Sequence, residues 1–328
     1  MRNINWAILG TGVVANEMAV ALTNAGKEIY SVGNRTYSKA VDFAQKYNIK
    51  KVYKDFHEMF SDPEVDVIYI TTPHNTHIEF MKSAIANGKH LLTEKSITLN
   101  SDELEQAMVL AKENSVILAE AMTIFHMPIY RKLREILNSG KLGKVNMITM
   151  NFGSYKEYDM SNRFFNKKLA GGAMLDIGVY AISFVRWFMD SKPDRILSQV
   201  KYAPTGVDEA ATILLENEQE QMATVALTLH SKQPKRGMVS CDKGYIEIME
   251  YPRAWEATIT YTEDGHTEKI EAGKNAEALK YEMEDMEKAI NGDESGIFLE
   301  YTKDVMDIMT EIRKEWCMFY PEELTGEE

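Results

Sequence analysis

The sequence INWAILGTGVVA at residues 4–15 decides the fold. An apolar run leads directly into Gly10, and a helical pattern begins at Val13. This order is typical of a buried strand, a glycine turn and a helix whose free N–H groups favour an anion. The first glycine permits a tight turn, Gly12 lets a pyrophosphate approach the backbone, and the small Ala15 lets helix and strand pack closely. The turn is therefore predicted to bind a dinucleotide, the alternative being a purely structural turn.

Strand and helix patterns alternate through the rest of the first 120 residues. The expected strands are 29–32, 65–71, 90–93 and 116–119, and the expected helices are 13–24, 39–47, one ending near 87, and 101–114. Asn100 and Glu103 have the spacing of a capping pair for the last of these helices. Alternation with short connections predicts βαβ crossovers and a doubly wound parallel sheet, the Rossmann arrangement.

The pattern changes after residue 120. Helices are expected at 127–139, 173–189, 276–291 and 298–318, with strands at 145–153, 195–203, 209–215, 221–230, 236–241 and 244–249. Alternation of side chains along 221–229 has the period of a strand in a mostly antiparallel sheet with one covered face. The fold class is therefore α/β with a following α+β domain. The expected domains are 1–120 and 121–328, ending in a frayed tail from residue 321.

Composition narrows the class of protein. The 328 residues carry a formal net charge of −13, which argues against binding to nucleic acid because phosphate contacts need clustered Lys and Arg. Two cysteines, Cys241 and Cys317, are too few for a disulfide framework or a four-cysteine zinc site. Asp176 and Arg186 interrupt the most apolar stretch, so no membrane span is expected. A soluble cytoplasmic protein is the resulting expectation.

The residues after the second strand bear on the choice of cofactor. An acid there would bind the ribose 2′-hydroxyl of NAD, but this chain has Gly33 followed by Asn34 and Arg35. A guanidinium can pair with a 2′-phosphate and stack on adenine. NADP(H) is therefore expected in preference to NAD(H), the alternative being that Arg35 is a solvated cation at a helix start.

Two further segments contain residues suited to chemistry. Glu94 and Lys95 follow a strand at the carboxyl edge of the sheet, where open α/β sheets bind ligands. The segment GGAMLDIGVY at 171–180 places Asp176 and Tyr180 four residues apart, on one face of a largely apolar helix. A carboxylate and a phenol on such a face indicate either a catalytic or binding site or a structural hydrogen bond.

Together these segments resemble the Gfo/Idh/MocA family of NAD(P)-dependent oxidoreductases, over nearly the whole chain. Many members have His at the position of Tyr180. A tyrosine there resembles the branch that includes glucose–fructose oxidoreductase, dihydrodiol dehydrogenase and xylose dehydrogenase. The resemblance implies a C-terminal domain with a large open sheet, used for substrate binding and for assembly into a homodimer or homotetramer. It also implies oxidation or reduction of a carbinol or carbonyl on a sugar, cyclitol or cyclic diol.

The resemblance also implies roles for individual residues. Lys95 and Tyr180 correspond to the family's lysine and proton donor or acceptor, and Asp176 to an acid that contacts substrate. The residues implied to bind the cofactor are Gly10, Thr11, Gly12, Val13, Val14, Asn34, Arg35, Thr71, Thr72, Pro73, His77, Glu94 and Lys95. The family's usual Glu-Lys-Pro has Ser96 in place of proline here, which removes a restraint on the backbone beside Lys95.

The chemistry of these side chains agrees with such roles. A tyrosine ordinarily titrates near ~10, and a nearby ammonium lowers that pKa and stabilises a developing alkoxide. We therefore expect Tyr180 to act as general acid and base and Asp176 to anchor a substrate hydroxyl. Lys95 is expected to tune the pKa of Tyr180 and to orient the reacting groups.

Other functions have weaker support in the sequence. His74 and His77 are three residues apart, but no H-E-x-x-H or cysteine cluster accompanies them, so no metal is expected. A methyltransferase would usually carry an acid where Asn34 and Arg35 stand. A non-catalytic redox sensor of the same fold remains the alternative to an enzyme. His126 could reach a substrate or be a hydrogen-bonded junction residue.

Overall fold

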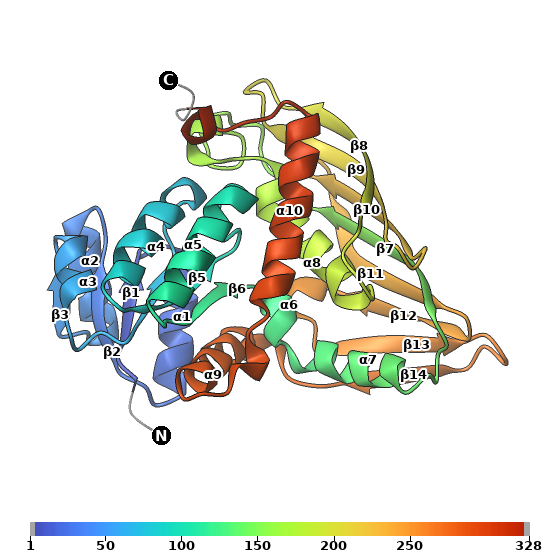
Figure 1. Cartoon of the computed structure of the whole chain (residues 1–328), viewed down its shortest axis with the longest axis horizontal. Helices are drawn as coiled ribbons and strands as arrows, with labels where there is room; N and C mark the ends of the chain where they lie inside the picture. The colour runs from blue at the N-terminus through green and yellow to red at the C-terminus, as the bar shows by residue number, and fades with distance from the viewer. Residues whose placement is uncertain (1–3, 325–328) are drawn as a thin grey trace. The chain divides into compact units, whose positions relative to one another are not determined.

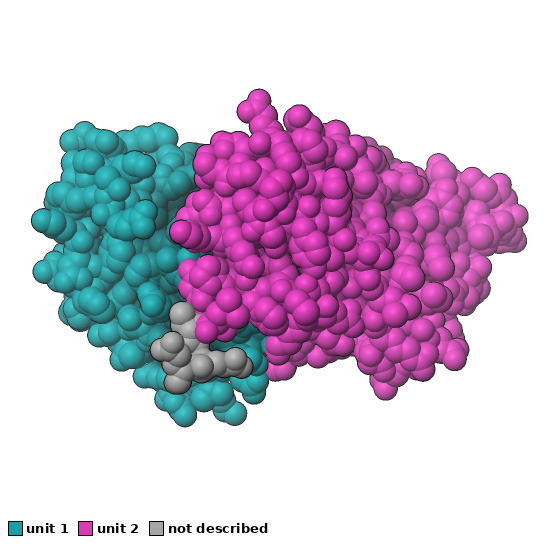
Figure 2. Space-filling model, turned by 90° about the horizontal axis from the view of Figure 1, so that it is seen from above, with its two compact units in different colours: residues 1–122, 276–299 teal, residues 123–275, 300–328 magenta. Residues whose placement is uncertain are grey.

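The computed structural model describes residues 4–324, which form two compact units. The first unit comprises residues 1–122 and 276–299, and the second comprises 123–275 and 300–328; Figure 2 shows them in two colours. The expected division near residue 120 agrees with the first change of unit. Residues 276–299, however, belong to the first unit, whereas the sequence prediction placed them in a continuous second domain.

The first unit is built on a six-stranded parallel sheet with the order β3-β2-β1-β4-β5-β6. Its strands are β1 (Trp6–Leu9), β2 (Ile29–Gly33), β3 (Lys51–Tyr53), β4 (Val67–Ile70), β5 (His90–Glu94) and β6 (Leu118–Ala121). Its helices are α1 (Val13–Asn24), α2 (Tyr37–Tyr47), α3 (Phe56–Ser61), α4 (His77–Ala86), α5 (Ser101–Glu113) and α9 (Ala278–Ile290). Strands β1 and β4 are buried throughout, as strands covered on both faces are. The predicted Rossmann arrangement is confirmed.

Helix α9 joins the first unit through contacts with its opening residues. The Trp6 indole Nε1–H donates to Glu287 Oε1 at 3.1 Å, and Lys27 Nζ lies 2.6 Å from Glu287 Oε2. Helix α9 also packs against α1. A segment at least 260 residues downstream of its partners therefore packs onto the first unit. Helical periodicity alone does not reveal which sheet a helix covers.

The second unit is built on an eight-stranded sheet with the order β14-β13-β12-β11-β7-β10-β9-β8. Its strands are β7 (Val145–Gly153), β8 (Arg195–Tyr202), β9 (Asp208–Glu216), β10 (Met222–Thr228), β11 (Gln233–Cys241), β12 (Gly244–Met249), β13 (Glu256–Tyr261) and β14 (Thr267–Glu271). Only the β7–β10 pair is parallel among these strands. The predicted mostly antiparallel sheet is confirmed, although β13 and β14 were not predicted.

Helices cover one face of this sheet. The helices of the unit are α6 (Thr123–His126), α7 (Pro128–Asn138), α8 (Val179–Phe188) and α10 (Leu299–Glu315). In Figure 1, α8 and α10 lie on the same side of the strands, and α8 packs directly on β7, β10 and β11. Along β10, Ala223, Val225 and Leu227 are buried, whereas Met222 is 44% exposed. The period-two pattern predicted for this strand therefore separates a covered face from an open one.

The end of the described chain differs from the expectation of a frayed tail. Residues Pro321–Leu324 form a short 3₁₀ helix. The Arg313 guanidinium donates to both carboxylate oxygens of Glu323 at 2.8 Å, and both side chains are almost fully buried. The expectation is wrong for residues 321–324 because this ion pair fastens them to α10. Residues 325–328 lie outside the described part of the chain.

One stretch within residues 4–324, Lys167–Phe188, is long and apolar enough to cross a membrane. Within its most apolar window, 83% of the residues are buried inside the protein. Such burial is a property of the core helix of a folded domain.

Candidate functional site

The predicted phosphate turn connects β1 to α1. Gly10 has φ +112°, and a Cβ at this position would lie 2.2 Å from Thr71 Oγ1. A Cβ on Gly12 would have no other atom within 4 Å, and no side chain caps the first turn of α1. The turn therefore presents free backbone N–H groups to open space, which fits a pyrophosphate.

Asn34 ties the end of β2 to this turn. Its Nδ2 donates to Thr11 Oγ1 at 2.7 Å, and its Oδ1 accepts from the backbone N–H of Thr36 at 2.8 Å. The Arg35 side chain is exposed and has no hydrogen bond or ion pair with any residue in 4–324. The guanidinium beside the turn is therefore available to an added anion.

The loop after β4 supplies the next predicted residues. Thr71 Oγ1 donates to the Leu9 carbonyl at 3.1 Å, so the ends of β1 and β4 are joined. Thr76 Oγ1 donates to the Pro73 carbonyl at 2.7 Å and lies 2.9 Å from Thr72 Oγ1. These bonds fix the Thr72–Pro73 backbone at the carboxyl edge of the sheet.

His77 braces this loop against the segment that follows β5. Its ring is fully buried, with Nε2 2.7 Å from the Thr72 carbonyl and Nδ1 3.2 Å from the carbonyls of Ser96 and Ile97. Burial lowers the pKa of His77 below its ordinary value, which favours the neutral ring. Any effect of His77 on a cofactor is therefore exerted through these two loops.

Glu94 and Lys95 occupy the end of β5 and the residue after it. The Tyr69 hydroxyl donates to Glu94 Oε1, and a ring nitrogen of His74 lies 3.1 Å from the Lys95 carbonyl. The peptide bond between Lys95 and Ser96 is cis. Downstream, the backbone N–H of Ile97 donates to the buried carboxylate of Glu120 at 3.1 Å. The side chains of His74 and Glu120 thus hold the backbone around Lys95, and Tyr69 holds the Glu94 side chain.

The predicted cofactor residues of the first unit therefore lie at one edge of the sheet. They follow the carboxyl ends of β1, β2, β4 and β5. In parallel sheets of this order, ligands bind at the edge where those ends meet.

The second unit carries Asp176 and Tyr180 on one continuous helical segment. Residues Met174–Gly178 form a single π-helical turn that continues into α8. A π-turn has i→i+5 hydrogen bonds and occurs frequently at functional sites. The widened turn keeps side chains four apart on one face, so the carboxylate and the phenol project together.

Gly178 lets this helix approach the sheet. A Cβ at Gly178 would lie 2.9 Å from Leu227 Cδ1 and 2.9 Å from Met174 Sδ. Tyr180, one turn along from Asp176, is half-buried with its ring 6.3 Å from that of Phe152. The sheet therefore supports the helix directly beneath the two polar side chains.

Arg163 approaches Asp176 from the loop after β7. Its Nη2 lies 3.4 Å from Asp176 Oδ1; the arginine side chain is 59% exposed and the carboxylate 12%. The guanidinium also lies 4.3 Å from the centre of the Phe164 ring. Nothing in the sequence indicated that Arg163 reaches Asp176, because loop conformation does not follow from local pattern.

His126, at the end of α6, is buried, with 3% of its surface exposed. Glu120 and Asp208, both buried, were not singled out in the sequence. Each is an acid within or at the start of an otherwise apolar strand. That pattern could have identified them, because a buried carboxylate needs a hydrogen-bond or charge partner.

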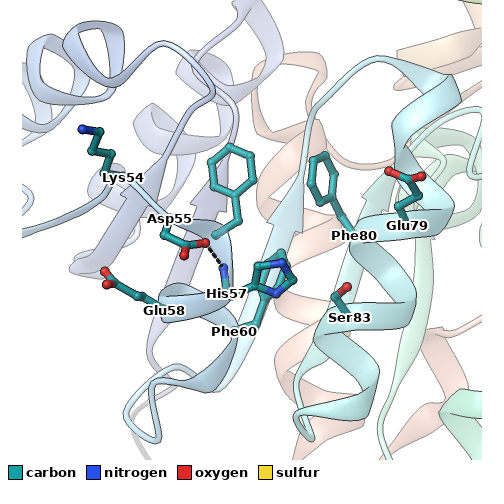
Figure 3. A pocket seen from close by; sticks show the side chains of 9 residues that line it. Lys54, Asp55, His57, Glu58, Phe60, Glu79, Phe80 and Ser83 are labelled. Carbon is teal, nitrogen blue, oxygen red and sulfur yellow. Dashed lines mark hydrogen bonds between the residues drawn. The ribbon is translucent and has the colours of Figure 1, made fainter.

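A separate cavity of about 590 Å³ lies between α3 and α4 in the first unit. In Figure 3, His57 and Phe60 of α3 lie opposite Phe80 and Ser83 of α4. The Phe56 and Phe80 rings meet edge to face at 5.3 Å. None of the lining residues is a predicted cofactor or catalytic residue, so the sequence analysis missed this cavity. Within residues 4–324, no cluster of three or more His, Cys, Asp or Glu could hold a metal ion.

Comparisons with known proteins agree with this geometry. Residues 4–122 match the model of an oxidoreductase family with an NAD-binding Rossmann fold, and residues 130–247 match the GFO/IDH/MocA C-terminal domain. A trans-1,2-dihydrobenzene-1,2-diol dehydrogenase from Xenopus laevis is 31% identical over 87% of this chain and 88% of its own length.

Two solved structures show the same fold at 18% identity. KijD10, a 3-ketoreductase from Actinomadura kijaniata in complex with NADP and TDP-benzene, has a TM-score of 0.85 over 95% of this chain and 98% of its own. An NAD binding oxidoreductase from Klebsiella pneumoniae has a TM-score of 0.87 over 96% and 97%. With both of its domains matched and a relative above 30% identity over most of its length, the chain belongs to the Gfo/Idh/MocA family of oxidoreductases, with an NAD(P)-binding Rossmann domain.

Proposed function

We propose that the chain is a cytoplasmic NADP(H)-dependent dehydrogenase or reductase acting on a carbinol or carbonyl of a sugar, cyclitol or cyclic diol. The observation that carries the proposal is the shared face of Asp176 and Tyr180 on the π-turn and α8. A carboxylate and a phenol one turn apart can bind one hydroxyl of a polyol while exchanging a proton with another. The likeness to a dihydrodiol dehydrogenase supports a vicinal diol as one substrate class.

The first unit would hold the dinucleotide at the carboxyl edge of its sheet. Backbone N–H groups from Gly12 to Val14 would bind the pyrophosphate, and Arg35 would bind a 2′-phosphate. When bound, the nicotinamide supplies or accepts the hydride. Thr72 and Pro73, held by Thr76 and His77, would form the wall beside it.

Three side chains would act on the substrate itself. Tyr180 would take the hydroxyl proton during oxidation and return it to the carbonyl oxygen during reduction. Lys95 would favour the phenolate and stabilise negative charge developing on the reacting oxygen. Asp176 would accept a hydrogen bond from a second hydroxyl, in place of its present partner Arg163.

A turnover screen tests this function. Purified protein with NADP⁺ or NAD⁺ would be offered aldoses, inositols and trans-cyclohexane-1,2-diol, and absorbance at the reduced nicotinamide band would be followed. We expect turnover with at least one polyol or diol and a preference for NADP⁺. Tight binding of NADPH without turnover on any of these compounds would instead favour a redox sensor.

Removal of the Arg35 charge should change cofactor selectivity. We expect Arg35→Ala to raise KM for NADP⁺ by about 10- to 100-fold, the range of a charged hydrogen bond, while KM for NAD⁺ changes little. Initial-rate kinetics with both cofactors provide the measurement. Lys50→Ala, which removes an exposed cation beyond the end of α2, serves as the control. Equal loss with both cofactors would argue against a phosphate contact.

The open face of the second unit's sheet is proposed to form a homodimer, which could pair further into a homotetramer. Large apolar side chains on this face are exposed, namely Leu197 (70%), Leu214 (42%), Met222 (44%) and Met147 (41%). Leu197 and Leu214 are cross-strand partners, and Met222 and Met147 are also paired, so these side chains form a contiguous patch. Contiguous exposed apolar patches are typical of protein interfaces.

Leu214→Asp should therefore dissociate the protein. We expect light scattering coupled to size exclusion to show a monomer for this variant and a dimer or tetramer for the wild type, because a buried unpaired carboxylate is costly. Val109→Asp, at a 50% exposed apolar residue on α5, is the matched control and should leave the assembly intact. A wild-type monomer at micromolar concentration would contradict the proposal.

A further inference from the structure

The helical segment that carries Asp176 and Tyr180 has an unusual N-terminal cap. Ala173, the residue before the π-turn, has no side chain that could satisfy the first N–H groups. Instead, the first residue of β9 reaches across, and Asp208 Oδ2 accepts from the backbone N–H of Met174 at 2.6 Å. Asp208 is fully buried. A carboxylate from a distant strand thus occupies the position that a neighbouring Ser, Thr or Asp usually fills.

Two side chains, Asp208 and Tyr320, contact the pair of glycines that precedes the helix. Gly172 has φ +127°, and a Cβ there would lie only 2.1 Å from Asp208 Oδ1. Tyr320, in the C-terminal segment, donates its hydroxyl to the Gly171 carbonyl at 2.8 Å. The start of the helix is therefore held from two directions, by the carboxylate of a strand and by a phenol near the chain end.

We infer that Asp208 is a positioning residue for the reaction, holding the π-turn so that Asp176 and Tyr180 face the substrate correctly. The inference rests on the proposed function, because it gives that helix a catalytic role. Asp208 touches neither Asp176 nor Tyr180 in any described hydrogen bond, so its action is exerted through the backbone of residues 172–174.

The protonation state of Asp208 should modulate this anchor. Burial raises the pKa of Asp208 to about 7, a rise partly offset by the hydrogen bond from Met174 and by the positive charge of Arg313. The other titratable groups that interact with its charge are the phenols of Tyr320 and Tyr202, and burial raises the pKa of both. Among the described residues, Oδ1 has no hydrogen-bond donor. The carboxylate, which also complements the dipole of the helix, therefore forms as pH rises through neutrality.

The test compares wild type with Asp208→Asn as the ratio of their kcat values between pH 5.5 and 8.5. The amide resembles the protonated acid, so we expect a ratio near one at low pH. The ratio should rise to about 3- to 10-fold above pH 8, the range of a charge at a helix N-terminus, with its midpoint near pH 7. Ionisations of other groups, including Tyr180, cancel in this ratio. The diol or aldose with the highest turnover is the substrate.

Stability gives an independent readout of the same carboxyl. Because its folded pKa lies above the usual value, the folded protein holds a proton between about pH 4 and 7 that the unfolded chain releases. Wild-type stability therefore falls as pH rises through that window, and the Asn variant lacks this fall. The Tm of Asp208→Asn relative to wild type should therefore increase from pH 5 to pH 8, while its kcat relative to wild type falls.

Two further variants separate positioning from general structural damage. Asp55→Asn alters a comparable cap, on α3 of the first unit, where Asp55 accepts from the His57 N–H; its kcat ratio to wild type should stay constant with pH. Tyr320→Phe should lower kcat without any pH-dependent ratio. Amide hydrogen exchange of residues 174–178 should be faster in Asp208→Asn at pH 8, whether or not a substrate is known.

A flat kcat ratio for Asp208→Asn, or unchanged exchange at residues 174–178, would overturn the inference. Lack of turnover by the wild type would count against the proposed function instead, and the exchange measurement would still decide whether Asp208 anchors the helix. The two failures are therefore distinguishable.

Discussion

Tyr180→Phe is expected to reduce kcat by about 10²- to 10⁴-fold, the usual contribution of a positioned general acid or base. The phenylalanine ring keeps the packing of Tyr180 near Phe152 and removes only the hydroxyl that would exchange the proton. Binding of NADPH, followed by its fluorescence, should be unchanged, because the residues proposed to bind the cofactor lie in the other unit. Turnover of the best diol or aldose from the screen provides the rate.

The control for this variant is Tyr245→Phe, which removes a phenol hydroxyl from the open sheet face, where the side chain is 37% exposed. Its kcat should equal that of the wild type. A Tyr180→Phe variant with the kcat of the wild type would show that Tyr180 is not the general acid and base. A fall in both kcat and NADPH affinity would indicate a folding defect rather than a lost proton transfer.

Gly10→Ala is expected to abolish dinucleotide binding and to lower the free energy of unfolding by about 2–4 kcal/mol. The added Cβ would meet Thr71 Oγ1 at 2.2 Å, in a backbone conformation that side chains rarely adopt. Either β1 and β4 must separate at their carboxyl ends or the turn must change shape. Urea unfolding and a fluorescence titration with NADPH measure the two effects.

Two other glycines provide contrasting controls. Gly26 also has positive φ, but no atom lies within 4 Å of its Cβ position, so Gly26→Ala should cost only about 1 kcal/mol and leave NADPH binding intact. Gly12→Ala faces open space, so it should preserve stability yet weaken NADPH binding by obstructing the pyrophosphate. If Gly12→Ala bound NADPH normally, the turn would not be the phosphate site.

The parts of the fold that follow from local pattern were predictable from the sequence. The Asn100–Glu103 pair is an example, since Asn100 Oδ1 accepts from the Glu103 N–H at 2.9 Å and Glu103 Oε2 accepts from the Leu99 N–H at 2.9 Å. Both partners lie within four residues, so spacing alone identifies them. The glycine turn and the helix with Asp176 and Tyr180 were predictable for the same reason.

Features that depend on distant partners were not predictable. Strand β3 has only three residues, and β14 is a polar strand at the edge of the sheet, so neither has enough apolar alternation to be recognised. Nothing near Met174 in the chain indicates that Asp208 caps its helix. The conformation of the loop that carries Arg163 to Asp176 likewise depends on packing that a single sequence does not reveal.

The late return of α9 to the first unit has a consequence for biosynthesis. A ribosome must add 260 residues after Lys27 before Glu287 can meet Lys27 and Trp6. Until then α1 lacks the helix that packs against it, and the surface of α1 that α9 covers stays exposed. A fragment ending at residue 122 would retain the phosphate turn but not this cover. The first unit is therefore completed only after the second sheet and α9 have been made.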